Sequence, residues 1–103
     1  MKRNPLTPAV RVQVEIALTS IRGDPARLSA LESDARELGL SGAEIDAAKR
    51  GASFNVVADA IVKYALGLET RDAEAASVSE GRLASFGMPM VAIEIALIVD
   101  DLH

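Results

Sequence analysis

The chain contains no cysteine and no tryptophan, has a single histidine, and only 3% of its 103 residues are aromatic. Without thiols it can form no disulfide, no thiolate metal site and no cysteine nucleophile. Hydrophobic residues nevertheless make up 50% of the chain, so its core must consist of Ala, Leu, Ile and Val. That composition favours closely packed helices over a β-sandwich, which uses more aromatic residues and Thr.

The chain also lacks an excess of positive charge. It has 15 acidic and 11 basic side chains, which gives a net charge of −4. Nucleic-acid binding requires clustered Lys and Arg, so we expect no nucleic-acid partner. The most apolar run, residues 90–99, is far shorter than the roughly 20 residues that span a bilayer, and no signal-peptide pattern follows the basic start. We therefore expect a cytoplasmic protein with no membrane partner.

The length predicts a single domain over residues 1–103, with an irregular N-terminal arm over residues 1–8. No low-complexity linker and no convincing repeat stands out. Residues 10–16 alternate valines with polar residues, which is typical of a strand. The apolar character then continues without alternation, and no second strand pattern exists to pair with it. We therefore predict a helix here, and an all-α fold: a compact bundle of about five to six helices.

Capping signals divide the rest of the chain into helices. Asp24 is placed to cap a helix whose first residue is Pro25, and Gly39 suits a left-handed helix end. Ser41 and Glu44 have the spacing of a capping box. The predicted helices cover residues 25–38, 42–49, 53 or 55 to 66 with Gly67 closing it, 71–85, and 89–102.

Apolar residues at three- and four-residue spacing predict the buried faces of these helices. The expected buried residues are Leu28, Leu31, Ala35, Leu38, Val56, Val57, Ala60, Ile61, Tyr64, Ala65, Ala75, Val78, Leu83 and Phe86. The last helix is apolar nearly all round, interrupted only by Glu94 and the terminal Asp100 and Asp101. A helix that is apolar on every side is normally buried on every side, so we expect a partner subunit to cover one face.

The order of these elements resembles a known family. The chain resembles the carboxymuconolactone decarboxylase and alkylhydroperoxidase D family at Arg11, at Gly23, in the turn at residues 39–41, and at the pair Glu44 and Ile45. Residues 58–60, 64–65, 86–87 and 91–102 resemble its later helices. The resemblance covers residues 10–102. It implies a helical fold that assembles as a homo-oligomer, a trimer or a hexamer, or that joins a second subunit of the same family.

The chain departs from this family where the family carries its chemistry. Counted from Gly39, the two family cysteines fall on Asp24 and Arg27, its histidine on Leu31, and its first glutamate on Val12. Neither a carboxylate nor a guanidinium can supply the thiolate of the peroxidase reaction. The absence of cysteine therefore excludes cysteine-dependent peroxidase activity, whereas the resemblance leaves a cysteine-independent decarboxylase reaction open.

Other residues could carry different chemistry. Glu15 and Glu94 lie in apolar runs; if both were buried they could share a proton or contact Arg11, and one could act as a general base. The structural alternative, which we favour, is that each is exposed or forms an ion pair. Arg11 and Arg27 could hold an anion, but salt bridges are the more common use, for Arg27 with Asp24 or Glu32.

The chain end offers Asp100, Asp101 and His103, but three terminal residues make a poor metal site, and we expect no metal and no cofactor. Two functions follow from these observations. We expect a non-catalytic or redox-inactive family member that acts as an oligomeric scaffold, binding module or companion subunit. The alternative is a cysteine-independent decarboxylase-type enzyme that acts on a small carboxylated or lactone substrate.

Overall fold

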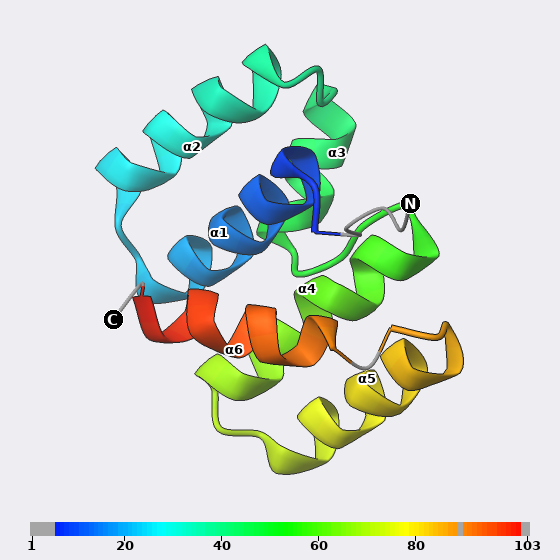
Figure 1. Cartoon of the computed structure of the whole chain (residues 1–103). Coiled ribbons are helices and arrows are strands. Elements are labelled where there is room, and N and C mark those ends of the chain that lie inside the picture. The colour runs from blue at the N-terminus through cyan, green and yellow to red at the C-terminus, as the bar shows by residue number, and fades with distance from the viewer. Residues whose placement is uncertain (1–5, 89, 102–103) are drawn as a thin grey trace.

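The computed structural model describes residues 6–88 and 90–101, and these residues form six α-helices and no strand (Figure 1). The predicted all-α bundle is confirmed. The helices are α1 (Pro8–Arg22), α2 (Pro25–Glu37), α3 (Gly42–Lys49), α4 (Val56–Glu69), α5 (Ala73–Ser85) and α6 (Val91–Asp101).

Residues 10–16 are helical, as predicted, and lie within α1. The helix starts at Pro8, the residue at which the predicted N-terminal arm ends, because the Thr7 hydroxyl accepts a hydrogen bond from the Val10 amide and caps the first turn. One side of α1 contributes Val14 to the larger core cluster, and another contributes Val12 to a second cluster. Burial on two sides explains the strand-like alternation, since a helix covered in this way carries apolar residues at closely spaced positions.

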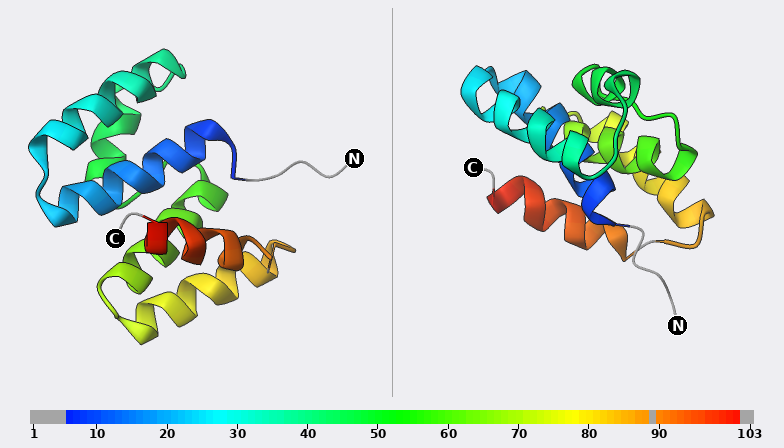
Figure 2. Two further views of the ribbon diagram at one scale, coloured as in Figure 1. Left: turned by 60° about the vertical axis from the view of Figure 1, so that its left-hand side comes forward. Right: turned by 90° about the horizontal axis from the view of Figure 1, so that it is seen from above.

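The six helices form two similar halves. In the first half α1 packs against α2 and α3, in the second α4 packs against α5 and α6, and the central helices α1 and α4 pack against each other (Figures 1 and 2). Corresponding boundaries recur 48 residues apart, at Pro8 and Val56 for the central helices and at Pro25 and Ala73 for the helices that follow them. The structure thus contains a repeated three-helix unit, which the sequence analysis did not detect.

Two apolar clusters hold the bundle together. The larger one joins α1, α4, α5 and α6, and its fully buried side chains include Leu18, Ile61, Leu83 and Ile95. The smaller one joins α1, α2 and α3 and consists of Val12, Ile16, Leu31, Ala35, Leu40, Ile45 and Ala48. Because α1 contributes to both clusters, it connects the two halves of the molecule.

The predicted caps are present. The Glu44 amide donates to the Ser41 hydroxyl at 3.1 Å, and the Ser41 amide donates to the Glu44 carboxylate at 3.0 Å, which completes the capping box of α3. Asp24 caps α2, and Gly39 has the left-handed φ of 94° expected after a helix end. Pro89, the predicted first residue of the last helix, lies outside the described residues.

Several predicted helix boundaries and buried residues were wrong. Helix α4 continues through Gly67 to Glu69, and α5 starts at Ala73 because Arg71 has a left-handed φ of 57°. Three apolar residues expected in the core are exposed: Leu38, Val56 and Val78. Leu38 and Val56 lie at helix ends, where the chain no longer follows the buried face, and Val78 lines a surface cavity described below.

Candidate functional site

The residues at the family's redox positions do not form a polar site. Val12 and Leu31 are each only 6% exposed and belong to the smaller apolar cluster, packed with Ile16 and Ile45. Asp24 and Arg27 lie at the surface near the start of α2. The interior at these positions is therefore closed by aliphatic side chains.

Glu15 lies between two arginines at the surface. Arg11 Nε donates to Glu15 Oε1 at 3.2 Å, and Arg27 Nη2 lies 3.9 Å from Glu15 Oε2. Glu94 is exposed on α6, which is the structural alternative considered for it. The Arg11–Glu15–Arg27 group is thus an ion-pair cluster whose two arginines are about half exposed.

The predicted partners of Arg27 need correction. The Asp24 carboxylate accepts a hydrogen bond from the backbone amide of Arg27 at 3.1 Å and serves as a helix cap. Glu32 forms an ion pair with Lys49 of α3 instead. The pairs Glu15–Arg27 and Glu32–Lys49 depend on how α1 and α3 pack beside α2, so the sequence could not give them.

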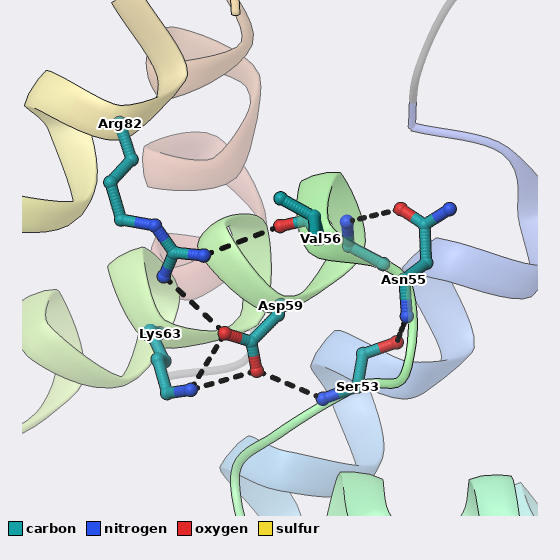
Figure 3. A network of polar contacts seen from close by, with 7 residues as sticks. Ser53, Asn55, Val56, Asp59, Lys63 and Arg82 are labelled. Carbon is teal, nitrogen blue, oxygen red and sulfur yellow. Dashed lines mark hydrogen bonds and ion pairs between the residues drawn. The ribbon is translucent and has the colours of Figure 1, made fainter. Parts of the chain in front are cut away.

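A second polar network surrounds Asp59 on α4 (Figure 3). Lys63 Nζ donates to both Asp59 carboxylate oxygens at 2.7 and 2.8 Å, and Arg82 Nη1 of α5 donates to Oδ2 at 3.3 Å. The backbone amide of Ser53 donates to Oδ1 at 3.0 Å. Asp59 therefore ties the α3–α4 loop, α4 and α5 together.

The hydrogen bonds around Asp59 set its ionisation. Burial by itself would raise the pKa of this carboxyl group, but the hydrogen bonds from Lys63, the Ser53 amide and Arg82 outweigh burial and lower the pKa. The sequence analysis did not single out these residues. The spacing of Asp59 and Lys63, four residues apart on a mostly apolar helix, was the available signal.

Lys63 and Arg82 also line a surface cavity of about 560 Å³ between α4 and α5, within the usual size range of small-molecule sites. Leu66, Gly67, Ala75 and Val78 form its apolar walls, and the largely buried Ser79 adds a hydroxyl group. Asp72 and Glu74 lie where α5 begins. The cavity thus combines an apolar middle with charged side chains of both signs.

Helix α6 carries an exposed apolar ridge, which consists of Ile93 and Leu97. Ile93 is 56% exposed and Leu97 is 60% exposed, and Met90 just before the helix is exposed as well. On the opposite side, Val91, Ile95 and Ile98 are buried in the larger core cluster. Tyr64, Ala96 and Asp100 line a groove beside the ridge.

No group of His, Asp or Glu side chains suited to a metal ion occurs in residues 6–88 and 90–101. In the same part of the chain, no helix has both the length and the apolar character needed to cross a bilayer. Asp100 and Asp101 are exposed at the end of α6, and His103 lies outside the described residues. No family model, curated protein or solved structure matches the chain.

Proposed function

We propose that the chain is a cytoplasmic, non-catalytic scaffold that assembles with further copies of itself and derives from the carboxymuconolactone decarboxylase and alkylhydroperoxidase D family that it resembles. The observation that carries this proposal is the ridge of α6, where Ile93 and Leu97 are more than half exposed. Apolar side chains at this spacing on one helix face are typical of a surface that packs against another helix.

A second copy of α6 in antiparallel orientation suits this surface best. If the twofold axis passes midway between the two residues, Ile93 of one copy packs against Leu97 of the other and the contact is reciprocal. Asp100 and Asp101 lie at the C-terminal end of α6, where their charges oppose the helix macrodipole. Antiparallel packing places these carboxylates beside the N-terminal end of the partner's helix, where negative charge is stabilising.

The closed interior supports the non-catalytic part of the proposal. A decarboxylase that uses the family's pocket needs polar groups around its substrate, whereas Val12 and Leu31 fill this region with aliphatic side chains. Glu15 is paired with Arg11 and Arg27 at the surface, and Glu94 is exposed on α6. None of these contacts favours the enzyme over the scaffold.

The test is the mass of the protein in solution, measured by size-exclusion chromatography with light scattering over a range of concentrations. Of the trimer and the hexamer that the resemblance implies, the twofold contact permits only the hexamer, which has twofold and threefold axes; a dimer is the smaller assembly that the same contact allows. The double substitution I93E/L97E should lower the mass to that of a smaller assembly, because it places carboxylates between the α6 helices of the two copies. I21E, which changes another exposed apolar residue, is the matched control and should leave the mass unchanged. A monomeric wild-type chain would overturn the proposal.

A further inference from the structure

The cavity between α4 and α5 has opposite charges at its two ends. Lys63 and Arg82 line one end, and Asp72 and Glu74 line the other. Glu74 and Arg82 are eight residues apart on α5. At a rise of 1.5 Å per residue, the backbone positions of the acidic and basic ends are about 12 Å apart.

The middle of the cavity is apolar and open. Leu66 and Val78 provide aliphatic walls, and Gly67 adds no side chain. Val78 is exposed although the periodicity of the sequence predicts its burial, and a ligand in the cavity would cover it. Ser79, only 4% exposed, supplies one hydroxyl between the charged ends.

The basic end is arranged for one negative charge. Asp59 holds Lys63 and Arg82 in place and balances one of their two positive charges, so the group keeps a net charge of +1. Lys63 and Arg82 are each at least one-third exposed and retain N–H groups for a ligand. A single carboxylate matches this end.

The acidic end is arranged for a cation. Asp72 uses one carboxylate oxygen to accept the hydrogen bond of the Ala75 amide, which fixes its side chain at the start of α5. Glu74 lies two residues further along, in the first turn of α5, and is exposed at the cavity rim. An ammonium group can donate to both carboxylates, because it has three N–H donors.

We propose that this cavity binds an ω-amino carboxylate, a small zwitterion whose ammonium and carboxylate groups are separated by an aliphatic chain. Its carboxylate contacts Lys63 and Arg82, its methylene groups cover Leu66 and Val78, and its ammonium group contacts Glu74. In an extended ligand with five methylene groups, the six bonds from the ammonium nitrogen to the carboxylate carbon span about 7 Å. A hydrogen bond at each end of the ligand bridges the remaining distance between the two ends of the cavity. This inference does not depend on self-association, since the cavity is built within one chain.

Three probes of similar length test the inference: 6-aminohexanoate, hexanoate and hexylamine, each titrated into the full chain and followed by amide chemical shifts in NMR. We expect saturable binding of 6-aminohexanoate, about two- to fivefold tighter than either singly charged probe, because it makes one additional ion pair. Shift changes should centre on the residues of the cavity. Equal affinity for 6-aminohexanoate and hexanoate would overturn the proposal, as would the absence of saturable binding.

Variants that remove one charge test which end of the cavity binds the carboxylate and which end binds the ammonium group. Glu74→Gln should reduce the affinity for 6-aminohexanoate to about that for hexanoate, without weakening hexanoate. Lys63→Gln should weaken both carboxylates and leave hexylamine unaffected, with the helical circular dichroism signal confirming that the variant is folded. Arg36→Gln, on the exposed surface of α2 away from the cavity, is the control and should change none of the affinities. An equal loss in all three variants would show non-specific charge attraction and overturn the proposal.

Discussion

Arg22, the last residue of α1, forms a bidentate ion pair with Glu69, the last residue of α4. Its Nε donates to Glu69 Oε2 at 2.8 Å and its Nη2 donates to Oε1 at 2.7 Å. The hydrogen bonds with Glu69 raise the pKa of Arg22 further above its already high value, against the opposing effect of burial. This pair fastens the C-terminal ends of the two central helices, and so joins the two halves of the molecule.

Removing the charge of Glu69 should destabilise the fold. Glu69 is only 9% exposed, so E69Q weakens both hydrogen bonds and removes a negative charge that lies against Arg22 in a largely buried position. We expect the free energy of unfolding to fall by about 1–2 kcal/mol, measured by urea denaturation at pH 7. E37Q changes an exposed glutamate at the end of α2 and is the control, with an expected change within about 0.5 kcal/mol. Equal effects of the two substitutions would contradict a structural role for the pair.

The contribution of Asp59 to stability should depend on pH. Its pKa is lowered in the folded state, so ionised Asp59 stabilises the fold above its ordinary pKa of about 4, and this contribution is lost as the pH falls through the lowered value. D59N should therefore reduce the free energy of unfolding at pH 7, and its difference from wild type should shrink as the pH falls below about 4. Chemical denaturation between pH 7 and pH 2.5 checks this expectation. The control D46N, at an exposed position of α3, should change the free energy of unfolding at pH 7 by no more than about 0.5 kcal/mol. A D59N effect of constant size at every pH would contradict it.

Two helical glycines should respond oppositely to alanine. A Cβ added to Gly67 of α4 would lie 2.8 Å from the backbone nitrogen of Ala76 in α5, so G67A should destabilise the protein by about 1–3 kcal/mol. A Cβ added to Gly81 of α5 meets no atom within 4 Å, so G81A should stabilise it by about 0.5–1 kcal/mol. Thermal and urea unfolding of the two variants provides the comparison. No effect of G67A would show that α4 and α5 do not approach as closely as described, and destabilisation by G81A would contradict the open space at Gly81.

The capping box of α3 should contribute about 1 kcal/mol to the free energy of unfolding. S41A removes the hydroxyl that accepts from the Glu44 amide, and a helix of eight residues has few other hydrogen bonds to hold its first turn. S33A, at an exposed position inside α2, makes the same chemical change without a cap and should be neutral or slightly stabilising. Urea denaturation of both variants separates the two effects. A loss of similar size in S33A would attribute the effect to the serine hydroxyl itself and not to the cap.

Much of the fold could be predicted because its signals are local. Asp24 before Pro25, and Ser41 three residues before Glu44, mark helix starts through hydrogen bonds that span only a few residues. The burial of Leu31 and Leu83 also follows from helical spacing alone. Val78 breaks this rule: it lies on an apolar stripe, yet no other helix covers it, and only the packing of the bundle decides which part of a stripe is covered.

The candidate site was less predictable for the same reason. Glu15, Arg11 and Arg27 were singled out from the sequence, but the contact between Glu15 and Arg27 depends on how α2 lies against α1. The network of Asp59 and Arg82 joins residues 23 positions apart, and the cavity beside it exists only because α4 and α5 run side by side. Contacts of this kind cannot be inferred from periodicity or capping.

The helical fold, the capped starts of α2 and α3, and the absence of thiol chemistry all follow from the sequence alone. These properties depend on backbone preferences, caps and composition, which act over one or two helical turns. Only the tertiary structure decided that two three-helix units pack through α1 and α4, and that the ridge of α6 stays open. It also brought Lys63, Arg82, Asp72 and Glu74 around one cavity. The physical reason is that these features arise from packing between helices far apart in the chain, where the geometry of the whole core decides which side chains meet.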